Sequence, residues 1–132
     1  MTKGAAAGNA TTQTILLVED EYVIMVAVQA TLEDAGFTVE THSASAPAMA
    51  ALEARPANYQ ALVTDIALVG RSDGWELARR ARELKPALAV IYMSGRTQDE
   101  WAANGVPHSI LVGKPMAPAQ IVAAVTSLLN QQ

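Results

Sequence analysis

Short apolar runs alternate with longer amphipathic segments along this chain. Residues 14–18, with the sequence TILLV, form an unbroken apolar run of strand length. Residues 22–35 carry apolar positions at helical spacing and are followed by Gly36, a residue that commonly ends helices. The pattern therefore predicts a β-strand and then an α-helix at the start of the chain.

The same pair of elements recurs four more times. We expect strands at residues 38–42, 61–64, 88–93 and 109–112, and helices at residues 46–55, 74–84, 98–103 and 118–129. Strands that are apolar throughout are buried on both faces, which requires a parallel sheet with helices on each side. The predicted fold class is α/β, a doubly wound five-stranded parallel sheet with five helices.

One domain accounts for nearly the whole chain. Its 132 residues are 51% hydrophobic, which is enough for one packed core, and no internal linker or repeat interrupts them. Residues 1–13 contain a single lysine and no apolar run. They are predicted to form a flexible tail rather than a signal peptide, and the domain is predicted to span residues 14–130.

The amino-acid composition limits the cellular locations and the classes of binding partner that we expect. A net charge of -4 without a Lys/Arg cluster offers no electrostatic attraction to nucleic acid or to an anionic membrane. The chain has no cysteine, and no apolar run approaches the roughly 20 residues of a membrane-spanning helix. We expect a cytoplasmic protein that binds neither nucleic acid nor membrane directly.

Ionic or hydroxyl residues follow four of the predicted strands. Glu19 and Asp20 follow the first strand, Asp65 the third, Ser94 the fourth and Lys114 the fifth. Ligands of parallel sheets bind outside the carboxyl ends of the strands. We therefore expect these side chains to meet at one edge of the sheet.

Three carboxylates that meet in this way would repel one another and recruit a hard divalent cation, for which oxygen ligands favour Mg²⁺. Asp20 and Asp65 are the expected direct ligands. A backbone carbonyl near Ala67 would be the remaining direct protein ligand of the ion, and Glu19 would act through water.

The same residues suit phosphoryl transfer. An Asp carboxylate can attack phosphorus to form an acyl phosphate, and Asp65 is the candidate nucleophile. The Lys114 ammonium would pair with one phosphoryl oxygen, and the Ser94 hydroxyl would donate a hydrogen bond to another.

With these residues in place, the chain from about residue 14 to residue 129 resembles a response regulator receiver domain of two-component signalling. That family has an acidic pair after strand one, a phosphoacceptor Asp after strand three, Ser or Thr after strand four and Lys-Pro after strand five. Asp-Gly opens its third helix. The matching positions are Glu19-Asp20, Asp65, Ser94, Lys114-Pro115 and Asp73-Gly74.

The resemblance implies a flavodoxin-like strand order, 2-1-3-4-5, with Mg²⁺ as cofactor and a cis Lys-Pro bond. It implies a phosphoprotein of a phosphorelay, phosphorylated by a histidine kinase or a histidine phosphotransfer protein. Such a protein is not an enzyme in the usual sense, although it assists its own phosphorylation and dephosphorylation.

Four features of the sequence depart from the family pattern. Leu68-Val69 replaces the common Met-Pro, and Asp73 lies eight residues after Asp65, one more than usual. Leu111 occupies the position of the usual Tyr or Phe, and Met116 that of a common Phe. We expect intact phosphorylation chemistry with an altered conformational read-out, centred on residues 94–105.

Other functions remain as alternatives. A phosphatase of the haloacid-dehalogenase type needs a second Asp where Ala67 stands, and a flavodoxin-like cofactor binder needs a phosphate-binding loop where Glu19-Asp20-Glu21 stands. A pseudo-receiver that only binds proteins would be expected to lack some of the site residues. No DNA-binding segment follows Gln132, so we expect a stand-alone receiver or a domain of a hybrid kinase.

Two helices are more apolar than packing on a sheet requires. The first has an unbroken apolar row at residues 23–28, and the last has Ile121, Val122 and Val125. We expect part of these rows to be exposed and to bind a partner protein or a second copy of the chain.

Overall fold

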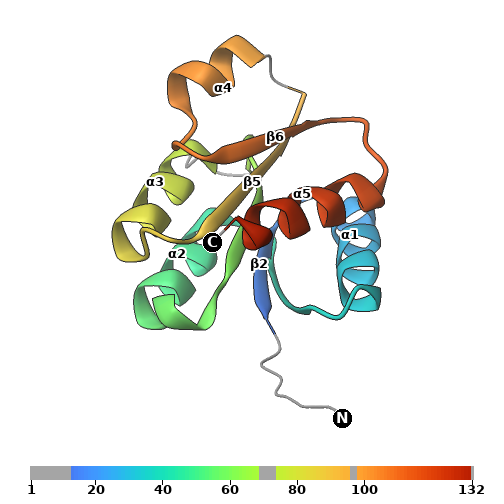
Figure 1. Cartoon of the computed structure of the whole chain (residues 1–132), viewed down its shortest axis with the longest axis horizontal. Coiled ribbons are helices and arrows are strands. Elements are labelled where there is room, and N and C mark those ends of the chain that lie inside the picture. The colour runs from blue at the N-terminus through green and yellow to red at the C-terminus, as the bar shows by residue number, and fades with distance from the viewer. Residues whose placement is uncertain (1–12, 69–73, 96–97, 132) are drawn as a thin grey trace.

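The computed structural model describes residues 13–68, 74–95 and 98–131. Its centre is a five-stranded parallel sheet in the order β3-β2-β4-β5-β6 (Figure 1). Counted along the chain this order is 2-1-3-4-5, so the predicted fold class and topology are confirmed. The strands are β2 (Thr14–Val18), β3 (Thr38–His42), β4 (Ala61–Asp65), β5 (Ala89–Ser94) and β6 (Ser109–Gly113).

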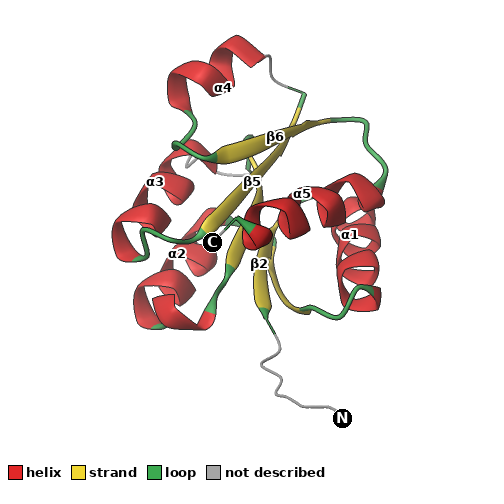
Figure 2. Cartoon of the chain, in the orientation of Figure 1, coloured by secondary structure: helices red, strands yellow, loops and turns green. Residues whose placement is uncertain are grey.

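Five α-helices accompany the sheet, as predicted. A short 3₁₀ turn, η1 (Pro56–Asn58), was not predicted. Helices α1 and α5 cover one face of the sheet, and α2 and α3 cover the other (Figure 2). The helices are α1 (Tyr22–Asp34), α2 (Ser45–Ala54), α3 (Gly74–Leu84), α4 (Gln98–Asn104) and α5 (Pro118–Asn130).

Three strands end one residue later than predicted: β6, which ends at Gly113, and the two that carry site residues. β4 includes Asp65 and β5 includes Ser94, because the ladder between them continues to the pair Asp65 and Met93, and β5 pairs Ser94 with Gly113 of β6. These two site residues therefore end their strands instead of following them. Their backbones are held by the sheet rather than by loops.

Two hydrophobic clusters lie on opposite faces of the sheet. Alternate residues of a strand point to opposite faces, so β2 sends Leu16 toward α2 and α3 and Leu17 toward α1 and α5. Every residue of β4 and β5 is buried, as expected for central strands covered on both sides. The edge strand β3 is only partly buried.

The outer faces of the two helix layers differ. On α1, the side chains of Tyr22, Val23 and Val26 are 73%, 80% and 41% exposed, which confirms that part of this apolar row faces solvent. The corresponding expectation for α5 is wrong for Ile121 and Val125, because both are fully buried in the core beside α1.

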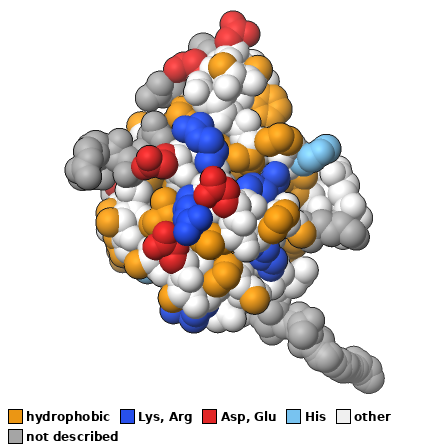
Figure 3. All heavy atoms as spheres, turned by 90° about the vertical axis from the view of Figure 1, so that its left-hand side faces the viewer, with side chains coloured by type: hydrophobic (Ala, Val, Ile, Leu, Met, Phe, Trp, Pro, Cys, Tyr) orange, Lys and Arg blue, Asp and Glu red, His pale blue; other side chains and the backbone are white. Residues whose placement is uncertain are grey.

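The layer of α2 and α3 is charged on its outer face. Arg80 pairs with Glu53 at 3.3 Å and with Glu83 at 3.1 Å, and side chains of both charges lie together on this side of the molecule (Figure 3). None of the described helices is long and apolar enough to cross a lipid bilayer.

Helix α3 begins against the end of β4. The Gly74 amide donates to the Ile66 carbonyl at 2.7 Å, and a Cβ atom at Gly74 would lie 2.3 Å from the Asp65 carbonyl oxygen. Backbone atoms cannot move aside as a flexible side chain can. Glycine is therefore required at this position by the close approach of two backbones.

Gly74→Ala should lower the free energy of unfolding by about 1–3 kcal/mol, because the added methyl group forces α3 away from β4. Urea denaturation would measure the loss. Gly95→Ala is the matched control, since a Cβ there meets no described atom within 4 Å. Equal effects of the two substitutions would contradict the steric explanation.

Candidate functional site

The last hydrogen bonds of the sheet hold the backbone around the site. The Glu19 amide donates to the His42 carbonyl at 3.1 Å, and the Lys114 amide donates to the Ser94 carbonyl at 2.9 Å. The Ile66 amide, directly after Asp65, donates to Met93 at 3.3 Å. The side chains at the strand ends thus start from backbone that regular sheet pairing has already fixed.

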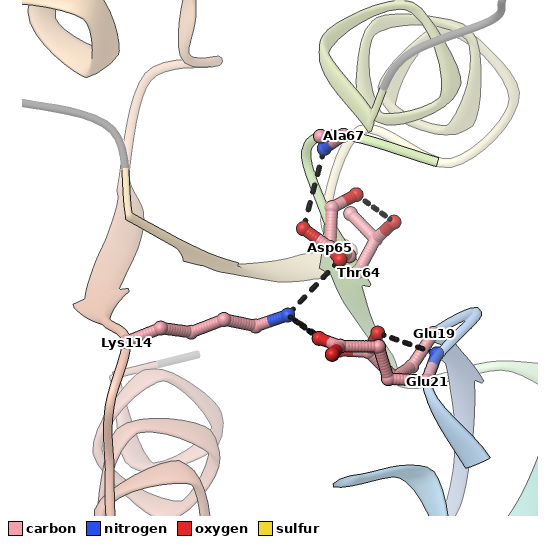
Figure 4. A network of polar contacts seen from close by, with 6 residues as sticks. All are labelled: Glu19, Glu21, Thr64, Asp65, Ala67 and Lys114. Atoms are coloured by element: carbon pink, nitrogen blue, oxygen red, sulfur yellow. Dashed lines mark hydrogen bonds and ion pairs between the residues drawn. The ribbon is translucent and has the colours of Figure 1, made fainter. Parts of the chain in front are cut away.

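The Lys114 ammonium lies at the centre of a group of carboxylates (Figure 4). Its Nζ atom is 2.9 Å from Glu19 Oε1, 3.0 Å from Asp65 Oδ2 and 3.4 Å from Glu21 Oε1. Burial alone would lower the pKa of Lys114, but the hydrogen bonds and charges of Glu19 and Asp65 outweigh it and raise this pKa. Lys114 therefore stays charged at physiological pH.

Asp65 is buried, with 6% of its surface exposed. One carboxylate oxygen, Oδ2, pairs with Lys114, and the other, Oδ1, accepts the amide hydrogen of Ala67 at 3.2 Å. The carboxylate still borders an open pocket whose lining includes Asp20, Ser94 and Gly95. Asp65 is thus oriented by two contacts and accessible from one direction.

Glu19 is fully buried. Its Oε2 atom accepts the Glu21 amide hydrogen at 3.0 Å, whereas Oε1 pairs with Lys114 and has no further partner among the described residues. Burial, which outweighs the opposing contacts with Glu21 and Lys114, raises the pKa of Glu19 to about 7. A buried carboxylate with one incompletely paired oxygen is well suited to a bound cation or its water.

The predicted metal ligands lie together. Glu19, Asp20 and Asp65 each offer an oxygen atom, and these atoms lie within 4.8 Å of one another. All three donors are hard oxygen ligands, so the residues fit Mg²⁺. For Ala67 the structure records a contact of the amide only, and the role of its carbonyl stays a prediction.

All of the predicted site side chains meet at one edge of the sheet. Ser94, 3% exposed, lines the same pocket as Asp65 and Lys114, and the predicted cis Lys114-Pro115 bond is confirmed. The loop after Asp65, which was predicted to be one residue longer than usual, includes Val69 and Asp73. Both residues lie outside the described part of the chain.

The contact of Glu21 with Lys114 was not predicted. Glu21 directly follows the acidic pair, so a third carboxylate at that strand end was the available signal. The supporting contact of Thr64 was also missed: its hydroxyl donates to the Asp65 carbonyl at 2.8 Å. A threonine before a strand-end aspartate does not by itself predict such a hydrogen bond.

Comparisons with known proteins agree with this geometry. The family model "Response regulator receiver domain" matches residues 15–126. A crystal structure of a response regulator receiver protein from Sinorhizobium medicae superposes with a TM-score of 0.86 at 44% identity, covering 90% of this chain and 95% of that one.

Curated relatives are longer proteins. The sensor kinase CckA of Brucella abortus is 29% identical over 90% of this chain, which spans 13% of that protein. The transcriptional regulatory protein CreB of Escherichia coli is 31% identical over 90% of this chain, which spans 52% of that protein. The chain thus corresponds to one part of each relative.

Burial of Glu19 should make stability depend on pH. The pKa of Glu19 is near 7 in the folded state and 4.5 in the unfolded state, so between these values only the folded state keeps the Glu19 proton. The stabilisation that this proton gives the folded state is therefore lost as pH rises through about 7. Glu19→Gln should remove this loss, gaining stability relative to the parent by on the order of 1–3 kcal/mol between pH 5 and 8.

Urea denaturation in EDTA across this pH range would measure the difference. Glu33→Gln, which removes an exposed carboxylate of α1, is the control and should follow the pH profile of the parent. A constant difference between Glu19→Gln and the parent at every pH would rule out titration of Glu19 in this range.

Proposed function

Since the chain belongs to the response regulator receiver domain family of two-component signalling, we propose that it accepts a phosphoryl group on Asp65. The donor is a phosphohistidine of a histidine kinase or a histidine phosphotransfer protein. The observation that carries this proposal is the Lys114 ammonium 3.0 Å from Asp65 Oδ2, at the edge of an accessible pocket that Ser94 also lines.

In the proposed reaction, an Asp65 carboxylate oxygen attacks phosphorus, and the bond between phosphorus and the donor's imidazole nitrogen breaks. The imidazole leaves with the electron pair of that bond and takes up a proton from solvent. Lys114 neutralises charge on a phosphoryl oxygen, and the Ser94 hydroxyl donates a hydrogen bond to another. The product is an acyl phosphate on Asp65.

Mg²⁺ is the proposed cofactor. Asp20, Asp65 and the Ala67 carbonyl would hold it directly, with Glu19 acting through water. When bound, the ion neutralises charge on the transferred group. The fit of the acidic cluster to a hard cation supports this assignment.

The wider role is also a proposal, and membership of the family supports it. We propose a signalling switch of the cytoplasm that is not an enzyme in the usual sense, because its own side chain is the substrate. A phosphorelay is supported by the similarity to part of a sensor kinase, and a response regulator by the similarity to part of a transcriptional regulatory protein.

The donor's docking surface is proposed to be the exposed side of α1. An apolar groove of about 500 Å³ lies between α1 and the start of α5, lined by Val23, Ile24, Ala27 and Met116, and Lys114 borders it as well. A partner helix seated there would lie beside the phosphorylation pocket. Self-association of two copies through this surface is the alternative use.

Asp65→Asn should abolish labelling by acetyl phosphate in the presence of Mg²⁺, because the amide cannot act as the nucleophile. Mass spectrometry would detect one added phosphoryl group on the parent and none on the variant. Urea denaturation should show a stability at least equal to that of the parent, since one charge of a repelling cluster is removed.

Asp20→Ala is the companion variant, which keeps the Asp65 nucleophile. It should bind Mg²⁺ at least about tenfold more weakly than the parent. Equal labelling of Asp65→Asn and the parent would refute Asp65 as the acceptor. A folded parent that takes up no phosphoryl group would instead identify a pseudo-receiver that acts only by binding.

Val23→Ser should slow phosphotransfer from a kinase or phosphotransfer protein that phosphorylates the parent by about fivefold, the loss of about 1 kcal/mol of contact. Labelling by acetyl phosphate should be unchanged, because this donor needs no docking surface. Ala46→Ser, an exposed position of α2 on the opposite layer, is the control. Equal slowing with both donors would contradict docking on α1.

A further inference from the structure

Helix α4 is attached to the rest of the molecule by few contacts. None of its described residues is buried, and Trp101 is its one side chain that packs against the core cluster beneath α2 and α3. The Trp101 indole N–H donates to Ser109 Oγ at 2.9 Å. Arg79 of α3 adds a hydrogen bond to the Asn104 carbonyl at 3.3 Å.

The indole contact continues into a chain of hydrogen bonds. Ser109 Oγ donates to the Val106 carbonyl at 2.6 Å, and the Val106 amide donates to the Tyr92 hydroxyl at 3.2 Å. Val106, Ser109 and Tyr92 are all buried. Losing one bond of a buried chain leaves a polar group without a partner, which costs more than losing an exposed bond.

Tyr92 is linked to the site by its place on β5 and by the contact of its ring with Trp75. It lies two residues before Ser94 on β5, so both side chains point to the same face of the sheet. Its ring contacts the Trp75 ring, with centroids 4.8 Å apart and planes at 59°. Trp75 follows Gly74, the residue that abuts the Asp65 carbonyl.

From this arrangement we infer that Tyr92 is a positioning residue that couples the phosphorylation pocket to α4 through Val106 and Ser109. A shift of Ser94 or of the start of α3 moves the Tyr92 ring, and the Tyr92 hydroxyl passes the shift to the turn that follows α4. This inference rests on the proposed function, because phosphorylation of Asp65 supplies the shift. Packed side chains with few alternative arrangements transmit such shifts well.

Tyr92→Phe tests the inference, because it removes the hydroxyl and keeps the ring against Trp75. Amide hydrogen exchange of residues 98–110 would be compared in the resting protein and after activation with beryllofluoride and Mg²⁺. In the variant, resting exchange should rise about threefold or more, and the change on activation should fall below about a third of the parent's. Labelling by acetyl phosphate should stay within about twofold of the parent.

Ser109→Ala breaks the next bond of the chain and should act in the same way. The double variant should be little worse than either single variant, because both remove one continuous chain. Tyr59→Phe is the matched control: Tyr59 is equally buried, but its hydroxyl bonds to Glu40 and Arg55 on the far side of the core from α4.

The outcomes separate the two proposals. Exchange like that of the parent in Tyr92→Phe, or additive effects in the double variant, would overturn the inference. A parent that cannot be phosphorylated would refute the proposed function, whereas the resting exchange of the variants would still decide whether Tyr92 holds α4.

Discussion

This structure depends on the parallel pairing of its strands, which all run in the same direction. Five parallel strands end at one edge, and the last ladder bonds join the backbones of Glu19, Ser94 and Lys114 to neighbouring strands. Side chains far apart in the sequence therefore meet without a dedicated loop to place them. The two helix layers bury both faces of the sheet and keep this edge open.

Among the described residues, the carboxylates of that edge are balanced by one cation, the Lys114 ammonium. Glu19, Glu21 and Asp65 share the Lys114 ammonium, and the full burial of Glu19 makes its ionised form costly. In the proposed reaction, a bound cation or an arriving phosphoryl group would change this balance, because the Lys114 ammonium contacts all three carboxylates. A buried carboxyl group with a raised pKa is typical of functional sites.

The fold and the site residues were predictable because each carried a local signal. Apolar runs such as residues 14–18 are buried on both faces and predict central strands, and charged residues at successive strand ends predict a shared site. The exposure of α1 followed from its excess of apolar residues, but the same reasoning failed for Ile121 because α1 covers that side of α5. Contacts between distant elements, such as Val106 with Tyr92, leave no periodic trace in the sequence.

The sparse attachment of α4 has a consequence for how such a domain can diversify. Apart from Trp101, which packs against the core cluster, its seven residues contribute no described side chain to the core, and the acidic cluster and Lys114 lie on other elements. Side chains on its outer surface are exposed, so we expect substitutions there to change packing little. A receiver of the proposed kind can therefore gain a new binding partner by changing residues of one short helix, while the residues of the proposed reaction stay the same.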